Sequence, residues 1–130
     1  MTDETMTIRE MCETFDVTPR TLRFYESKEL LGPIRQGQKR LFTRRDRARL
    51  KLILRGKRFG FSLEEIRQLL DLYDMGRSKE QLAKSYELAS KHLAEMEAKR
   101  DELNQAIAEL QRQLEWGARE LRNQENGAAA

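Results

Sequence analysis

The chain has 130 residues, of which 38% are hydrophobic and 36% are charged, with 25 Lys and Arg against 22 Asp and Glu. This length and charged fraction predict one small domain, with or without an extended helical element, and exclude a large cleft between two lobes. One Cys and one His cannot form, within one chain, a zinc site of Cys or His ligands, an iron–sulfur cluster or a disulfide framework.

The first residues, 1–5, are acidic and lead into no apolar stretch of signal-peptide length. No apolar run in the chain has the length needed to span a bilayer. We therefore expect a cytoplasmic protein without contact to a membrane, in a reducing compartment.

The next residues carry signals for two short helices. Thr7 and Glu10 form a predicted capping box, and apolar residues at helical spacing follow as far as Asp16. Thr18-Pro19 then places a cap residue before a proline at the first helical position, which predicts a second helix from about Pro19 to Ser27. Two short helices joined by so tight a turn indicate a helix-turn-helix.

A small β-hairpin, or wing, is predicted after these helices. Ile34 and the pair Leu41-Phe42 flank a polar stretch, and Gly37 is expected in the turn between the two strands. The tip of this wing would carry Gln38, Lys39 and Arg40.

Two further helices are expected beyond the wing. Thr43 with Asp46 caps a third helix, which glycines 56 and 60 are expected to break up. A capping box at 62–65 opens a fourth helix, which Gly76 is expected to end. The inward side of the fourth helix is predicted to consist of Leu63, Ile66, Leu69, Leu70 and Tyr73.

The last segment is the most regular. From 82 to 121 apolar residues recur in alternating steps of four and three, which is a heptad repeat over a helix of roughly 65 Å. The rest of the chain is too short to cover this stripe, so we expect a homodimeric coiled coil. The residues expected at the dimer interface are Leu82, Tyr86, Ala89, Leu93, Met96, Leu103, Ile107, Leu110 and Leu114.

Polar or small residues interrupt the stripe at two places. Arg100 is either a residue that sets the register or the place where the two helices diverge. Gly117 is the other interruption. The expected domains are therefore 1–77, a coiled-coil helix at 78–122 and a disordered tail at 123–130.

The charge is distributed unevenly. Residues 1–77 carry 17 basic and 12 acidic side chains, whereas residues 78–130 carry 8 and 10. Between Arg35 and Arg58 there are 11 basic residues and one acid, Asp46. Such a run is either a solvated helix face or a surface that binds polyanions, and the lack of acids to neutralise it favours phosphate contact.

The motif TPRTLRFYE at 18–26, with 37–42 and 60–66 behind it, resembles the mercury-resistance regulator (MerR) family over about residues 6–75. Residues 15–26 and 50–63 look most like a short bacterial subgroup that controls branched-chain amino acid and fatty acid breakdown. The resemblance implies a mainly α protein in which a winged helix-turn-helix is followed by a long helix forming an antiparallel coiled coil. It also implies a homodimer that binds double-stranded DNA at a pseudo-palindromic promoter element and acts on RNA polymerase by distorting that DNA.

The resemblance also assigns residues. Arg20 and Arg23 would read bases in the major groove, and Tyr25 would reach a phosphate. Lys39 stands where the family often has Tyr, so a lysine contact would replace a tyrosine contact there. The complete set expected to bind DNA, in the nucleoid of the cell, is Thr18, Arg20, Thr21, Arg23, Tyr25, Arg35, Gln38, Lys39, Arg40, Phe42, Arg44 and Arg45.

Two residues, Cys12 and Trp116, invite more than one interpretation. Cys12 lies on the apolar side of the first helix, where a buried structural thiol is more common than a sensing one. Family members that sense metals or oxidants have cysteines at or beyond the long helix, where this chain has none. Trp116 either packs against the partner's DNA-binding domain or lines an effector pocket with Tyr86.

The function expected from these patterns is transcription regulation in response to a small organic metabolite, by resemblance an acyl-CoA or a related intermediate. The alternative is an architectural or excisionase-like protein that bends DNA without an effector. We expect no enzyme, cofactor or metal site, because the sequence shows no nucleophile with a base, no phosphate loop and no ligand constellation.

Overall fold

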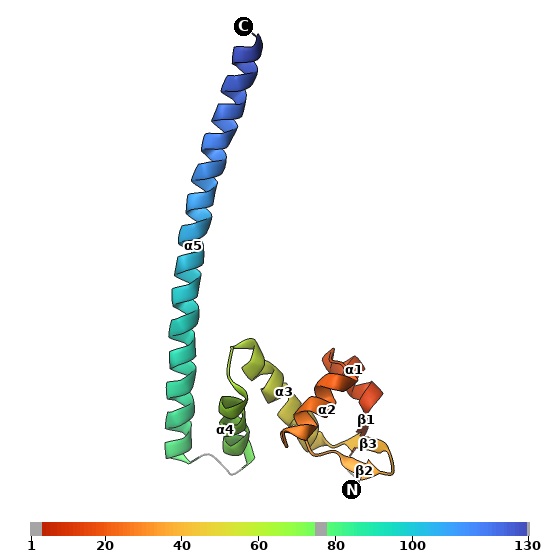
Figure 1. Cartoon of the computed structure of the whole chain (residues 1–130). Helices are drawn as coiled ribbons and strands as arrows, with labels where there is room; N and C mark the ends of the chain where they lie inside the picture. The colour runs from red at the N-terminus through yellow and green to blue at the C-terminus, as the bar shows by residue number, and fades with distance from the viewer. Residues whose placement is uncertain (1–3, 75–77, 130) are drawn as a thin grey trace. The chain divides into compact units, whose positions relative to one another are not determined.

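The computed structural model describes residues 4–74 and 78–129. The elements in chain order, labelled in Figure 1, are β1 (Met6–Thr7), α1 (Ile8–Phe15), α2 (Pro19–Ser27), β2 (Ile34–Gln36), β3 (Lys39–Phe42), α3 (Arg44–Arg58), α4 (Leu63–Asp74) and α5 (Lys79–Ala129). The chain divides into two units, 1–88 and 89–130, and α5 runs through both. These elements form a winged helix-turn-helix followed by one long helix, and the predicted fold class is confirmed.

The ends of α1 and α2 confirm the capping signals in the sequence. The Thr7 hydroxyl accepts from the Glu10 amide at 3.2 Å, and the Glu10 carboxylate accepts from the Thr7 amide at 3.0 Å. These bonds satisfy amides of the first turn and lower the pKa of Glu10. Asp16, with φ 54°, ends α1 in the left-handed conformation, and Thr18 caps α2 with Pro19 at its start.

The wing belongs to a three-stranded antiparallel sheet in the order β1-β3-β2. β2 pairs with β3 in the register Ile34 to Leu41, and Gly37 supplies the positive φ of 63° in the turn between them. β1, which the sequence pattern did not reveal, pairs Met6 with Phe42 on the other edge of β3. This pairing ties the wing to the start of the chain.

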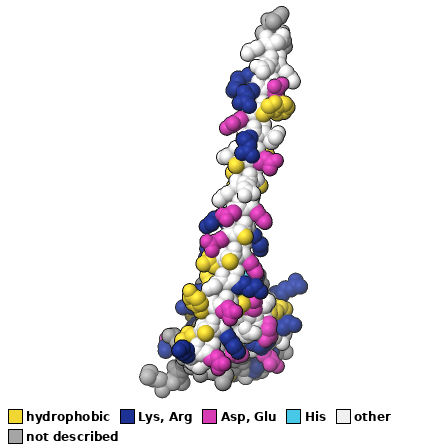
Figure 2. Space-filling view, turned by 90° about the vertical axis from the view of Figure 1, so that its left-hand side faces the viewer, with side chains coloured by type: hydrophobic (Ala, Val, Ile, Leu, Met, Phe, Trp, Pro, Cys, Tyr) yellow, Lys and Arg dark blue, Asp and Glu magenta, His cyan; other side chains and the backbone are white. Residues whose placement is uncertain are grey.

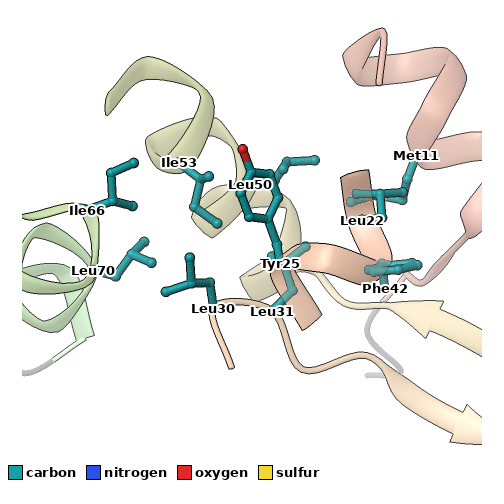
Figure 3. Packing of buried hydrophobic residues seen from close by; sticks show 10 residues of the cluster. All are labelled: Met11, Leu22, Tyr25, Leu30, Leu31, Phe42, Leu50, Ile53, Ile66 and Leu70. Carbon is teal, nitrogen blue, oxygen red and sulfur yellow. The ribbon is translucent and has the colours of Figure 1, made fainter. Parts of the chain in front are cut away.

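Helices and sheet of the first unit share one hydrophobic core. Figure 3 shows Tyr25 between two groups of side chains, one from α1, α2 and β3 and the other from α3, α4 and the loop after α2. The ten buried residues of this core are Met11, Leu22, Tyr25, Leu30, Leu31, Phe42, Leu50, Ile53, Ile66 and Leu70. The helix α2 is therefore attached to this core through one face, by way of Leu22 and Tyr25.

Gly56 does not interrupt α3, contrary to the expectation that glycine would break this helix. α3 continues to Arg58, and Gly56 is buried inside it. A Cβ on Gly56 would lie 2.8 Å from Cγ1 of Ile66, so glycine is required here for the close approach of α4. Gly60, with φ 83°, does lie in the turn between the two helices.

The inward side of α4 is narrower than predicted. Ile66 and Leu70 are buried, Leu63 and Leu69 are half-buried, and Tyr73 is 52% exposed. Tyr73 lies in the last turn of α4, beyond the reach of the core. Gly76, expected to end this helix, lies outside the described residues.

The helix α5 is 51 residues long and includes most of the segment expected to be a disordered tail. That expectation is wrong for 123–129, because Gln, Glu and Ala favour a helix and no proline interrupts it. Hydrophobic side chains recur along the helix between charged ones (Figure 2). Among the described residues, no helix is long and apolar enough to cross a membrane.

Candidate nucleic-acid interface

The helix α2 presents two arginines on its exposed side. Arg20 and Arg23 are three positions apart, so they project from neighbouring points of one helix face. Thr18 and Thr21 are engaged in the cap, since their hydroxyl oxygens lie 2.9 Å apart and the Thr21 amide donates to the Thr18 hydroxyl. The threonines therefore fix the start of the helix, and the arginines remain directed outward from it.

The loop after α2 is held by side chains of α3 and α4. Arg67 donates to the Lys28 carbonyl at 2.7 Å, and Arg49 donates to the Leu30 carbonyl at 2.7 Å. The Gly32 amide in turn donates to Asp46 at 2.9 Å. These three bonds fix the end of α2 relative to α3 and α4, and so they orient the two arginines at its surface.

Two arginines of the wing are bound by one carboxylate of α2. Glu26 accepts from Nη2 of Arg35 at 2.8 Å and from Nε of Arg40 at 2.6 Å. Partial burial raises the pKa of Glu26, but the hydrogen bonds from Arg40 and Arg35 outweigh it and hold this pKa below its ordinary value. Glu26 thus stays ionised and fixes the wing to the recognition helix.

Between the wing and α2 lies a hollow of about 320 Å³ with a basic lining. Arg23 from α2 and both Lys39 and Arg40 from β3 reach this hollow. Lys39 and Gln38 at the tip of the wing are exposed, as predicted. Because Arg40 is paired with Glu26, Arg23 and Lys39 are the two cations of this hollow that remain available to a phosphate backbone beside α2.

A second hollow, of about 410 Å³, also borders α2. Arg20 and Thr21 line it from α2, and Lys57 and Phe61 line it from α3 and the turn that follows. Lys57 was not among the predicted DNA contacts, although it belongs to the basic run. The fold brings Lys57 to the same hollow as Arg20, and the sequence pattern carries no signal for that proximity.

Two aromatic residues predicted to bind DNA lie in the core. Phe42 is fully buried, because it faces inward at the end of β3 opposite Met6, and its predicted contact with DNA is therefore wrong. Tyr25 is 4% exposed, and this burial raises the pKa of its hydroxyl. Tyr25 lines the hollow beside Arg20, and its phosphate contact stays a prediction.

Four of the eleven basic residues in the run are paired with acids that lie outside it in the sequence. Glu26 binds Arg35 and Arg40, and Asp74 at the end of α4 binds Arg45 and Arg49. Burial raises the pKa of Asp74, but the hydrogen bond from Arg45 and the charge of Arg49 outweigh it and lower this pKa. The expectation that the run has no neutralising acids is wrong for these four residues.

The open cations are consequently fewer than predicted. Of the predicted basic contacts, Arg20, Arg23, Lys39 and Arg44 are exposed, and none of them is in an ion pair with a described residue. Arg45 is exposed over 66% of its side chain but is bound to Asp74 at 2.8 Å. The candidate interface therefore consists of α2, the wing tip and the start of α3, with Lys57 at its edge.

The side chains predicted for the dimer interface are exposed along α5. Leu93, Leu103 and Leu114 are 57%, 61% and 65% exposed in the single chain. Tyr86 and Trp116, the residues considered for an effector pocket, are also exposed. They lie 30 positions apart, about 45 Å along one helix, so they cannot line the same pocket within one chain.

The single thiol belongs to α1. Cys12 in α1 is half-buried against the core, and this burial raises its pKa. Within 4–74 and 78–129, no three His, Cys, Asp or Glu side chains are grouped so that they could hold a metal ion. The residues present do not fit a metal centre of thiolate ligands.

The chain matches two family models, "MerR HTH family regulatory protein" over residues 6–72 and "MerR, DNA binding" over residues 47–113. It is 36% identical over 107 residues to the HTH-type transcriptional regulator ZntR of Escherichia coli K12, covering 81% of this chain and 75% of that relative.

Two solved structures are similar over most of their length. One is the regulator HiNmlR bound to promoter DNA, with a TM-score of 0.63 and 25% identity over 79% of this chain and 78% of that one. The other is the transcription regulator PbrR691 of Ralstonia metallidurans in complex with lead(II), with a TM-score of 0.63 and 33% identity over 81% and 82%.

Proposed function

The chain belongs to the MerR family of DNA-binding transcription regulators, and on that premise we propose that its homodimer binds a pseudo-palindromic promoter element through α2 and the wing. The observation that carries this proposal is that two exposed cations, Arg23 on α2 and Lys39 on the wing, line the same hollow. Arg on a recognition helix can bind guanine bidentately, whereas Lys on a wing binds phosphate as a point charge.

The proposed mode of action is deformation of the promoter. A dimer with two fixed recognition helices matches the two-fold symmetry of its site, and it can hold the DNA between them bent or untwisted. Such a change in DNA shape acts on the RNA polymerase that binds the same promoter. The anchoring of α2 by Arg49, Arg67 and Asp46 supports this proposal, because a distorted duplex pulls on the helices that hold it.

We propose an organic metabolite as the signal, and by the subgroup resemblance an acyl-CoA or a related intermediate. PbrR691 was solved with lead(II), and a metal signal is therefore the main competing idea. The one thiol of this chain, Cys12, lies in α1 and is half-buried against the core of the first unit, which supports an organic signal.

The proposed specificity is tested with two alanine variants. Arg23→Ala should weaken binding to the cognate site by about 1–3 kcal/mol more than binding to random DNA. Lys39→Ala should weaken both alike and reduce the log–log salt slope by about one unit. Fluorescence anisotropy at several salt concentrations measures both effects, and Lys91→Ala on the exposed side of α5 is the control of equal charge loss.

Equal losses on both DNAs for Arg23→Ala would contradict its assignment as a base reader. A Lys39→Ala variant that keeps the full salt slope would contradict the assignment of the wing tip as a phosphate contact. An unchanged slope for Lys91→Ala shows that the effect depends on position and not on net charge.

The effector is tested by footprinting the dimer on the region upstream of its own gene, with and without candidate acyl-CoAs. A ligand that changes the footprint and the Trp116 fluorescence supports the proposal. A footprint unchanged by every ligand would favour the second candidate, an architectural or excisionase-like protein that bends DNA without an effector. The unpartnered apolar stripe on α5 favours the regulator, because a fixed dimer sets the spacing of two half-sites.

A further inference from the structure

Two aromatic residues follow one another in α2, and only one of them belongs to the core. Tyr25 is buried, whereas Phe24 is 44% exposed. Successive positions of a helix differ in direction by about 100°, so the buried Leu22 and Tyr25 define one side of α2. Arg20, Arg23 and Phe24 lie together on the opposite side, within an arc of about 100°. The exposed ring of Phe24 therefore shares its helix face with the two exposed arginines.

We infer that Phe24 contacts the C5-methyl group of a thymine in the major groove and thereby adds an apolar base contact to those of the arginines. This contact rests on the proposed function, which places α2 against DNA, and goes beyond it by naming a further residue and the chemical group that it recognises. Positions four apart on a helix have Cβ atoms about 5–6 Å from each other, and base pairs stack about 3.4 Å apart. The thymine should thus lie within about two base pairs of the base that Arg20 binds.

An apolar ring on this face finds one kind of partner in the major groove. The base edges there carry hydrogen-bond donors and acceptors, with which a Phe side chain forms no hydrogen bond. Thymine alone among the four bases adds an apolar group, its C5-methyl. The modified base 5-methylcytosine carries a methyl group at the same ring position. The contact therefore selects for the methyl group and not for the other atoms of thymine.

The ring of Phe24 is held in one orientation by its neighbours in the chain. Its centroid lies 5.6 Å from that of Tyr25, with the two rings tilted by 56°, and Nζ of Lys28 lies 5.7 Å from it. Both are contacts that stabilise an aromatic side chain. A side chain that is already oriented loses little conformational freedom on binding, so the exposed part of this ring is suited to a specific contact.

The surroundings of Phe24 are apolar. Phe24 lines the hollow of about 410 Å³ together with Phe61, Leu63 and Ile66, and Arg20 lines the same hollow. A methyl group that enters it leaves water and packs against apolar side chains, beside the arginine that binds a neighbouring base. Burial of one such group corresponds to about a fourfold gain in affinity.

Replacement of thymine by uracil tests this contact, because uracil differs from thymine only in lacking the C5-methyl group. Each thymine of the promoter site defined by footprinting is replaced singly, and fluorescence anisotropy measures the affinity of the full chain for each duplex. At a thymine in each half-site, uracil should weaken binding of the parent chain about fourfold. Phe24→Ala should bind the thymine and uracil duplexes equally at that position.

Cytosine and 5-methylcytosine at the same position give a second measurement. The parent chain should bind the methylated duplex about fourfold more tightly than the unmethylated one, and Phe24→Ala should not distinguish them. Each comparison is a ratio within one protein, so a lower fraction of folded protein in a variant does not change it. Phe59→Ala is the matched control, since Phe59 is 41% exposed at the end of α3. This variant should keep the full fourfold ratio.

Three results would overturn the assignment of Phe24. They are equal binding of thymine and uracil by the parent chain at every position, a Phe24→Ala variant that keeps the ratio, and a Phe59→Ala variant that loses it. If the parent chain still prefers its promoter to random DNA, the proposed function stands and the contact of Phe24 alone is wrong. A parent chain without that preference would refute the proposed function and this contact with it.

Discussion

Gly56 offers a test of how closely α3 and α4 pack beneath the recognition helix. In Gly56→Ala the new Cβ would lie 2.8 Å from Cγ1 of Ile66 and 3.7 Å from Cδ2 of Phe61. Ile66 is only 2% exposed, so a shift of its side chain disturbs the packed core. The added methyl group must therefore push α4 away from α3 or force Ile66 out of its preferred rotamer.

Two opposing effects set the magnitude. Alanine is a better helix former than glycine by about 1 kcal/mol, and Gly56 is in the interior of α3. Overpacking of a filled core costs about 1–3 kcal/mol. We expect the second effect to prevail, so the first unit should lose about 1 kcal/mol of its unfolding free energy.

Native-state hydrogen exchange at the amides of Leu50 and Ile53 measures this loss, because it reports on α3 and not on α5. Gly127→Ala, where a Cβ would meet nothing within 4 Å, is the control and should cause no loss. Adding Ile66→Ala to Gly56→Ala should cost less than Ile66→Ala alone, since the new methyl group fills part of the space. If Gly56→Ala instead slows exchange, the close approach of the two helices is wrong.

Two other predictions concern the acids that bind the basic run. Glu26→Gln should tighten binding to random DNA about threefold and steepen its salt dependence, because Arg35 and Arg40 lose the carboxylate that neutralises them; an anisotropy titration that gives the same change for Glu13→Gln would contradict this. The pKa values of Glu26 and Asp74 are lowered in the folded chain. At a pH between the folded pKa and the ordinary pKa, the unfolded chain therefore binds more protons than the folded chain. The stability should accordingly fall as the pH drops through that range. In acid denaturation the stability of the Asp74→Asn variant should fall less steeply with pH than that of the parent chain. An equal fall in both proteins would exclude Asp74 as a source of the pH dependence.

The helix ends show how much of the fold can be predicted from the sequence. Thr7 with Glu10, Thr18 with Pro19 and Thr43 each cap a helix through bonds to residues within three positions. Such signals are local, and the predicted ends of α1 and α2 are confirmed. The end of α5 differs from the prediction because the polar composition of 123–130 indicates a disordered tail, whereas the Gln, Glu and Ala residues of this segment favour a helix.

The candidate site depends on distant contacts, and these were harder to predict. Arg40 and Glu26 are 14 positions apart, and Arg49 and Asp74 are 25 apart, so no short pattern indicates that they pair. Phe42 is an aromatic residue in the wing, which favours a DNA contact, but the pairing of β3 with β1 directs its side chain into the core. Charge and residue type indicate the candidate surface, whereas packing decides which of its basic side chains remain open.

The bonds that hold the loop after α2 have a consequence for how this regulator can change its target. Arg67 and Arg49 donate hydrogen bonds to the carbonyls of Lys28 and Leu30, and Asp46 accepts one from the amide of Gly32. All three side chains therefore bind main-chain atoms of the loop. Main-chain atoms are the same whatever residues α2 presents to the DNA. Under the proposed assignment of Arg20 and Arg23 as base readers, substitutions there would alter the recognised DNA sequence without loosening the helix, and selection or engineering could retarget α2 one base contact at a time.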